Sequence, residues 1–235
     1  MEVTAIIVAR KGSKRVKAKS LLELNGETLI ARKVKQLKQC KNISRIVVGS
    51  DSDEMLSEGK NAGAEIVRRP DYYCDESVAS ANDMIKNMCE LIKTDVVVWS
   101  HCTNPLLSPN TYDKAIEIFI DNLDNGYDSL LSVVELKEHL WDSNKKVFNY
   151  NPYAERHVPA RELPAMYMQD GGIFIQPYEQ MKNNSYFFGR KPYLFEIPKE
   201  EFLDINDYKD YLLAKVLIEH SIKENKKEEQ IDQKI

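Results

Sequence analysis

Short, continuously apolar segments alternate with longer amphipathic segments over the first 134 residues of this 235-residue chain. Continuous apolar character, without a polar residue at every second position, is typical of strands buried on both faces of a parallel sheet. This alternation predicts an α/β domain with a doubly wound, mostly parallel sheet. We expect strands at 4–9, 45–49, 64–68, 95–99 and 128–134, and helices at 28–40, 53–62, 77–92 and 109–123.

The regular alternation stops after Val134. Residues 135–170 are rich in proline and show little periodicity, and the segment is too long for a plain loop in a compact domain. We interpret it as an excursion: a lid, a small subdomain or a dimerisation arm. The chain is predicted to form a single domain, 1–223, followed by a charged tail, 224–235, that frays. Further strands are expected at 172–175 and 193–197, and a last helix at 207–223.

The composition excludes several classes of protein. Apolar residues make up 43% of the chain and charged residues 30%, and the formal net charge is −4. This balance is globular and does not favour a broad nucleic-acid-binding surface. No apolar run approaches the roughly 20 residues that span a bilayer, and the first residues do not form a signal peptide. We therefore expect no nucleic-acid or membrane partner and a cytoplasmic location. The cysteines form no C-x-x-C pair, which predicts reduced, mostly buried thiols.

The most basic stretch, Arg10–Lys19, directly follows the first predicted strand. Ligands of a doubly wound sheet bind beyond the carboxyl ends of its strands, so this stretch is placed to meet one. Gly12 allows close backbone approach, and the surrounding cations attract phosphate. The stretch matches neither a Walker A loop nor G-x-G-x-x-G, which disfavours P-loop and hydride-transfer enzymes. A solvated basic loop is the alternative.

Two further polar clusters are expected near that loop. Residues 100–106 (SHCTNPL) follow the strand 95–99, and residues 202–207 (FLDIND) precede the last helix. Carboxylate and amide oxygens beside bound phosphates suit Mg²⁺, which takes only one or two protein carboxylates. Asp204 could instead cap the helix or remain solvated.

A series of short segments, in chain order to about residue 220, resembles the acylneuraminate cytidylyltransferase family (CMP-sialic acid synthetases and relatives). Each match is weak by itself, whereas the ordered series is specific. The matching segments are IVARKGSKR (7–15) with Lys19, LNGETLI (24–30), SDS (50–52), RP (69–70) with DESVAS (75–80), CTNPL (102–106), LP (163–164) with DGGIFI (170–175), and LDIND (203–207).

The resemblance implies a Rossmann-like nucleotidyltransferase that moves CMP from CTP to an acidic sugar, releases pyrophosphate and requires Mg²⁺, in the service of surface glycan synthesis. It also implies a homodimer whose arm, 135–170, reaches towards the partner's active site. The implied catalytic residues are Arg10, Lys19 and Asp204. The implied nucleotide contacts are Ala9, Arg10, Gly12, Ser13, Lys14, Lys19 and Ser80. The implied metal ligands are Asp204 and Asn206, and Asp207 could replace Asn206 by a small shift.

The sequence departs from the family pattern mainly where the family recognises its acceptor, so the substrate contacts predicted at His101, Arg161 and Asp170 do not identify that acceptor. We expect another nonulosonic acid, an octulosonic acid, or an unrelated acid or phosphonate. A sugar-1-phosphate nucleotidyltransferase, a CTP-binding protein without turnover and an RNA-binding protein are the alternatives. The departures are His101 for Gln, Cys102 for Pro, Leu107 for Arg, Ala160 for Arg, Asp170 for Asn and Asn206 for an acid.

Overall fold

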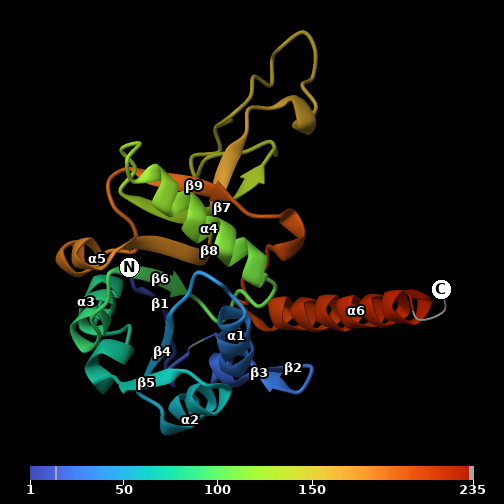
Figure 1. The fold of residues 1–235 in the computed structure, drawn as a ribbon. Coiled ribbons are helices and arrows are strands. Elements are labelled where there is room, and N and C mark those ends of the chain that lie inside the picture. Colours follow the sequence, from blue (N-terminus) through green and yellow to red (C-terminus); the bar gives the residue numbers. More distant parts are fainter. Residues whose placement is uncertain (14, 233–235) are drawn as a thin grey trace.

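A seven-stranded sheet forms the centre of the protein in a computed structural model that describes residues 1–13 and 15–232, with side chains to Lys223 (Figure 1). The strand order is β5-β4-β1-β6-β8-β7-β9, and only β8, among the described strands of this sheet, runs antiparallel to its neighbours. The predicted mostly parallel sheet is confirmed. The strands are β1 (Val3–Val8), β4 (Arg45–Ser50), β5 (Glu65–Arg68), β6 (Val96–Ser100), β7 (Ser129–Leu136), β8 (Met166–Pro177) and β9 (Pro192–Glu196).

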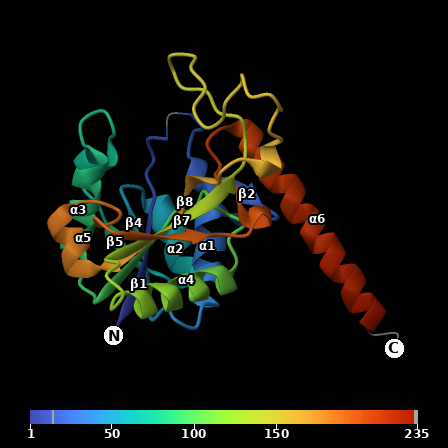
Figure 2. The same ribbon diagram turned by 90° about the horizontal axis from the view of Figure 1, so that it is seen from above.

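Helices cover both faces of the sheet, as the predicted doubly wound arrangement requires (Figures 1 and 2). One apolar core lies between the sheet and α1, α2 and α4, and a second lies between the sheet and α3 and α5. A last helix, α6, extends away from the body of the molecule. The helices are α1 (Leu29–Lys38), α2 (Asp53–Ala62), α3 (Ala81–Leu91), α4 (Pro109–Asn122), α5 (Tyr178–Asn184) and α6 (Tyr208–Asp232).

Side-chain caps define where the first four of these helices begin. Thr28, Ser52 and Ser108 each accept a hydrogen bond from a backbone N–H in the first turn of the helix that follows. Ser80 and Asp83 form a reciprocal capping box, so α3 begins at Ala81 and not at residue 77 as expected. Polar residues with high turn preference thus set the boundaries that hydrophobic periodicity leaves open.

The chain reverses its direction of travel across the sheet at β1. From β1 it moves outward through β4 to β5, and it then crosses back to place β6 on the other side of β1. The loops that leave β1 and β6 therefore diverge at one edge of the sheet, which is where doubly wound folds bind ligands. The segments 9–22 and 101–107 occupy this edge.

The excursion between β7 and β8 is shorter than the sequence predicted. β7 continues to Leu136 and β8 begins at Met166, so the protruding segment, here called the arm, comprises residues 137–165 (Figure 1). It extends beyond the sheet, and a single bridge pairs Trp141 with Val147. The pairing of β7 with β8 absorbs extra residues of β8 opposite Ser132, which is a bulge that no strand pattern indicated.

Other elements were not predicted. A short hairpin, β2 (Glu23–Leu24) and β3 (Glu27–Thr28), precedes α1, and its turn places Asn25 and Gly26 at positive φ. Asn-Gly is the strongest short hairpin signal, so this element was readable from the sequence. The helix α6 extends to Asp232 over most of the predicted tail, and residues 233–235 lie outside the described part.

The structure bears on two expectations drawn from composition, the state of the cysteines and the membrane-spanning potential of the helices. Cys40, Cys74, Cys89 and Cys102 are all buried free thiols, which confirms the prediction made for them. None of the helices in the described part of the chain combines the length and the apolar character needed to cross a membrane.

Gly59 tests the close packing of α2 on β4. A Cβ atom at this position would lie 2.8 Å from Cγ2 of Val48, so we expect Gly59→Ala to destabilise the protein by about 1–3 kcal/mol. Ser57→Ala, on the exposed face of the same helix, is the control and should stay within about 0.5 kcal/mol. Urea unfolding measures both values, and equal stabilities of the two variants would contradict this packing.

Candidate active site

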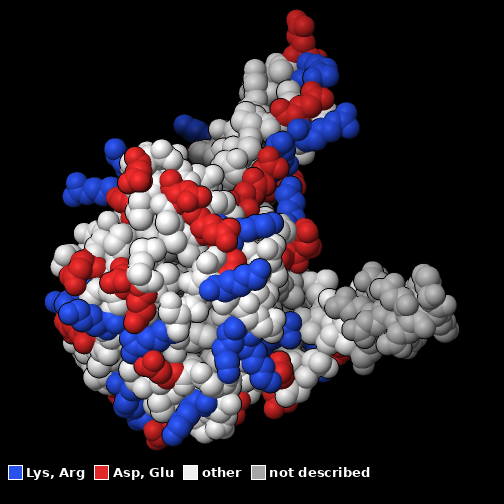
Figure 3. Space-filling view, in the orientation of Figure 1, with Lys and Arg blue, Asp and Glu red and all other residues white. Residues whose placement is uncertain are grey.

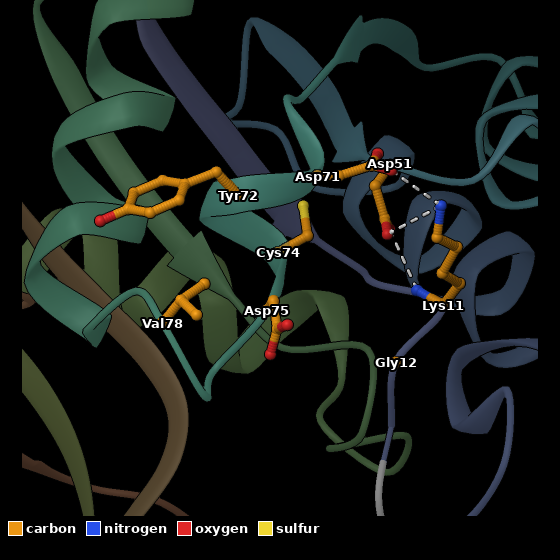
Figure 4. Close-up of a pocket in the computed structure, with 8 residues that line it drawn as sticks. All are labelled: Lys11, Gly12, Asp51, Asp71, Tyr72, Cys74, Asp75 and Val78. Carbon is orange, nitrogen blue, oxygen red and sulfur yellow. Dashed lines mark hydrogen bonds and ion pairs between the residues drawn. The ribbon is translucent and has the colours of Figure 1, made fainter.

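The loop that leaves β1 is held in place by Asp51, which follows β4. The backbone N–H of Lys11 donates to Oδ1 of Asp51 at 3.0 Å, and the Lys11 ammonium lies 3.7 Å from Oδ2 of Asp51 and 3.3 Å from Oδ2 of Asp71. Asp51 is only 4% exposed, so it forms a rigid support. Figure 4 shows Lys11 facing these two carboxylates while the chain continues through Gly12. The first turn of the basic loop is therefore fixed through its backbone.

A cavity of about 390 Å³ opens beside this turn. Charged and apolar groups share its wall, and Tyr72 and Val78 lie across from Lys11 (Figure 4). Gly12 borders this cavity. A Cβ atom added at Gly12 would meet none of the described atoms within 4 Å, so packing does not require glycine at this position. The lining residues are Lys11, Gly12, Asp51, Asp71, Tyr72, Cys74, Asp75 and Val78.

Arg10 borders two further cavities on the same edge of the sheet, of about 250 and 240 Å³. Its guanidinium forms an ion pair with Glu76 and donates to the Cys74 carbonyl at 3.5 Å. The smaller cavity brings Arg10 together with Ser13 and Lys19, three of the predicted ligand contacts. The larger is lined by Arg10, Arg69, Tyr73, Glu76, Ala79, Ser80, Ala81 and Met84.

The larger of these two cavities contains a buried arginine that the sequence indicated only as part of the RP motif, without a role. Arg69 has no exposed surface, donates from Nε to Oδ1 of Asn87 at 3.2 Å and from Nη2 to the Tyr73 carbonyl at 3.0 Å. Burial lowers the pKa of its guanidinium. Ser80 lines the same cavity, but its hydroxyl caps α3 and donates to Asp83 at 2.7 Å, so its predicted ligand contact stays a prediction.

Another predicted contact of the basic loop, Ala9, is part of the core. Ala9 is 3% exposed, and its N–H donates to the Gly49 carbonyl at 3.0 Å, so its side chain belongs to the core. Lys14 lies outside the described residues. Among the positions predicted from the motif, Arg10, Ser13 and Lys19 line a cavity with their side chains. Ala9 instead holds the start of the loop to β4 through its backbone.

Lys19 connects the basic loop to the acidic segment before α6. Its ammonium donates to the Ile205 carbonyl at 2.7 Å, and the side chain is half-buried. Burial lowers the pKa of Lys19, Arg15 and Arg10 lower it further, and the Asp204 carboxylate opposes this shift. The ammonium therefore lies within electrostatic reach of both the cationic loop and Asp204.

Asp204 and Asn206 form the oxygen-bearing side of the site. Nδ2 of Asn206 donates to Oδ2 of Asp204 at 2.7 Å, which leaves the amide oxygen of Asn206 directed elsewhere. Asp207 accepts from the N–H groups of Lys209 and Asp210, at 2.8 and 3.1 Å, and so caps α6. Asn206, and not Asp207, is thus the partner of Asp204.

The donor chemistry of this pair suits Mg²⁺. In the described residues, no group of three or more His, Cys, Asp or Glu side chains is arranged to hold a metal by itself. One carboxylate and one amide oxygen match the few protein ligands that Mg²⁺ takes when phosphate oxygens complete its shell. The residues present fit the ion.

His101 follows β6 and lies in an aromatic setting. The Trp99 indole N–H donates to Nε2 of His101 at 3.2 Å, which places any proton of the neutral ring on Nδ1. Burial lowers the pKa of this imidazole, so it is neutral at pH 7. The Phe174 and Phe187 rings meet it edge to face, with centroids 6.1 and 5.9 Å away. His101 is a neutral hydrogen-bonding group beside an apolar wall.

Asp170 and Arg161, the other predicted substrate contacts, lie in different surroundings. Asp170 is 5% exposed, and its Oδ2 accepts from the Gly172 N–H at 3.2 Å. Burial raises the pKa of its carboxyl group, and Oδ1 has no hydrogen-bond partner among the described residues. Arg161 is exposed on the arm, away from the sheet edge. Within a single chain the structure therefore leaves Arg161 apart from His101 and Asp170, and the roles of all three stay predictions.

A buried lysine near His101 was also missed. Lys33, on α1, has no exposed surface and donates to the Asn104 carbonyl at 2.8 Å and to the Tyr112 hydroxyl at 2.9 Å. Burial lowers the pKa of its amine to about 7. In the sequence, Lys33 is one of several lysines on an amphipathic helix, and no local signal distinguishes it from the exposed ones.

The arrangement can hold a polyphosphate chain between unlike charges. Cations of the basic loop line one cavity, and Asp204 with Asn206 stands beyond Lys19 as a pair of oxygen-bearing side chains. On the face drawn in Figure 3, Lys and Arg are interspersed with Asp and Glu over the body and the arm. Charge of one sign is concentrated only locally there, which suits a small anionic ligand better than a nucleic acid.

Residues 4–232 match the sequence model of the Cytidylyltransferase family, and the chain belongs to this family. The resemblance that the motifs indicated is thereby confirmed. The chain is a CTP-dependent cytidylyltransferase, a transferase of nucleotidyl groups.

Individual relatives give the same result. A pseudaminic acid cytidylyltransferase of Campylobacter jejuni is 24% identical over 92% of this chain and 96% of its own length. A 3-deoxy-manno-octulosonate cytidylyltransferase of Chlorobaculum tepidum is 37% identical over 51% of this chain and 46% of its own length. The fold is similar to a solved CMP:2-keto-3-deoxy-manno-octonic acid synthetase complexed with CTP, with a TM-score of 0.68 and 12% identity over 94% of this chain and 100% of that one.

Asp51 provides a test of how the basic loop is supported. Asp51→Ala removes the acceptor for the Lys11 N–H and one partner of its ammonium, so we expect CTP to bind about tenfold more weakly. Isothermal titration calorimetry with CTP measures the change. Asp71→Asn is the matched control, because Asp71 is exposed and contacts only the Lys11 side chain among these groups; an equal loss in both variants would contradict the role of Asp51.

Proposed function

We propose that the protein transfers CMP from CTP to an acidic sugar, a nonulosonic or related 2-keto acid, with release of pyrophosphate and dependence on Mg²⁺. The observation that carries this proposal is the cavity in which Arg10, Ser13 and Lys19 meet, at the switch point of a cytidylyltransferase sheet. The similarity to a pseudaminic acid cytidylyltransferase over nearly the full chain supports a nonulosonic acid. We further propose a cytoplasmic reaction that supplies activated sugar for surface glycans.

The positive side chains carry the proposed chemistry. Arg10 and Lys19 bind the β- and γ-phosphates of CTP, and the acceptor hydroxyl attacks the α-phosphorus in line. A new bond forms between that oxygen and phosphorus, the bond from phosphorus to the bridging oxygen breaks, and pyrophosphate leaves while the hydroxyl proton passes to solvent. Positioning and fixed positive charge supply most of the rate enhancement in such transfers.

Asp204 and Asn206 are the residues proposed to hold Mg²⁺. The ion neutralises phosphate charge when it is bound. The hydrogen bond between the two side chains, at 2.7 Å, keeps them beside each other. Lys19, bonded to the Ile205 carbonyl, keeps this segment against the basic loop.

The acceptor is proposed to bind on the β6 side of the crevice. His101, whose ring bonds the Trp99 indole N–H and the Gly171 backbone, forms part of the polar wall on this side, and the half-buried Phe187 ring stands beside it. An acidic sugar also requires a cation for its carboxylate. We propose that Arg161 of a partner subunit supplies it, because the arm extends away from its own sheet and leaves this residue exposed. The proposal therefore includes a homodimer.

A pyrophosphate-release screen tests the reaction itself. With CTP and Mg²⁺, we expect release in the presence of a nonulosonic acid such as pseudaminic acid, and loss of release with EDTA. The panel includes 3-deoxy-manno-octulosonate, sialic acid and phosphonates, each with CTP, UTP and GTP. Release with UTP or GTP and a sugar 1-phosphate, but with no CTP and acid pair, would contradict the proposal. CTP binding without turnover on the whole panel would contradict it as well.

Lys19→Met tests the proposed phosphate contact while keeping much of the packing of this half-buried side chain. We expect kcat/KM to fall about a hundredfold, because a fixed charge beside the leaving phosphates is lost. Lys17→Met, at an exposed position of the same loop, is the control and should retain activity. Thermal unfolding checks that both variants fold, and wild-type turnover in a folded Lys19→Met variant would remove Lys19 from the mechanism.

A further inference from the structure

The segment that follows β6, residues 101–106, here called the β6 loop, is held by side chains from α1. Lys33 donates to the Asn104 carbonyl at 2.8 Å, Gln36 donates from Nε2 to the Pro105 carbonyl at 2.8 Å, and Arg32 donates from Nε to the same carbonyl at 3.2 Å. These carbonyls belong to a segment without strand or helix structure, so side chains replace the backbone partners that regular structure would provide. The position of the β6 loop therefore depends on α1.

Lys33 is the centre of this attachment. Its Nζ lies 5.0 Å from the centre of the Tyr112 ring, and its two hydrogen-bond partners are the neutral oxygens of Asn104 and Tyr112. The Tyr112 hydroxyl in turn lies 2.6 Å from Oγ of Ser100, at the end of β6. A buried amine without its hydrogen bonds is costly, so these oxygens and the ammonium hold one another in place.

The opposite side of the β6 loop contacts the proposed acceptor side of the site. The Thr103 carbonyl accepts from the Ile205 N–H at 2.9 Å, next to Asp204. Nδ2 of Asn104 donates to the Asp170 carbonyl at 3.2 Å, and the Asn104 N–H donates to the His101 carbonyl at 3.3 Å. A shift of Asn104 is thereby passed to His101 and to β8.

We propose that Lys33, assisted by Arg32 and Gln36, is a positioning residue that fixes the β6 loop and so sets how tightly the enzyme binds its acceptor. This inference rests on the proposed function, because it assumes an acceptor beside His101. The hydrogen bonds of the three α1 side chains go to residues 104, 105 and 112. The cavity proposed for CTP is lined by Arg10, Ser13, Arg15, Lys19 and Glu76. Loss of the attachment is therefore expected to weaken the use of the acceptor while the affinity for CTP stays nearly unchanged.

Lys33→Met is the primary test, because methionine replaces the amine by an apolar group of similar length. We expect kcat/KM for the acceptor to fall about ten- to a hundredfold, as displaced positioning groups do, while the CTP dissociation constant measured by calorimetry changes less than about threefold. Lys35→Met, on the exposed side of α1, is the matched control and should change neither value. Unchanged acceptor kinetics in a folded Lys33→Met variant would overturn the proposal, as would equal losses for acceptor and CTP.

Gln36→Met provides a second test that leaves the buried amine in place. It removes the donor to the Pro105 carbonyl, and we expect a smaller rise in acceptor KM with CTP binding intact. If Lys33→Met does not fold, this variant decides: a selective acceptor defect supports the proposal, and wild-type acceptor KM overturns it. Absence of turnover in the wild type with every acid would refute the proposed function instead, so the two failures are distinguishable.

Discussion

The placement of β1 between β4 and β6 is the constraint on which the site depends. Both neighbours run parallel to β1, yet the chain reaches them by opposite routes, with α1 on one face and α3 on the other. The loops after β1 and β6 must then leave in different directions, which opens a crevice that side chains of the sheet do not fill. The cavity proposed for CTP lies along that opening.

Burial, as well as sequence, determines where the charged groups of the crevice are held and how strongly they interact. Asp51 is almost fully buried and holds the backbone of the basic loop, whereas Lys19 is half-buried and links that loop to the Asp204 segment. Water is scarce around such groups, so their mutual interactions are stronger than those of exposed pairs. A chain with a net charge of −4 can therefore present a cationic phosphate site without being basic overall.

The sequence allowed the nucleotide side to be predicted better than the acceptor side. Arg10, Ser13 and Lys19 lie within one short motif, and the structure places all three around one cavity. His101 and Asp170 are far apart in the chain, and only the packing of β8 against the β6 loop brings them near one another. A bulge opposite Ser132 sets where Asp170 points, and such a register change has no signature in a strand pattern.

The sequence by itself determined the parallel sheet, the position of the basic loop at its edge and the family, because continuous apolar strands and short motifs are local properties. Only the tertiary structure decided which lysine is buried. Lys33 and Lys35 look alike on an amphipathic helix, but α1 packs so that Lys33 faces Asn104 and Tyr112 while Lys35 faces solvent. Burial depends on what packs against a helix, and that information lies about 70 residues further along the chain.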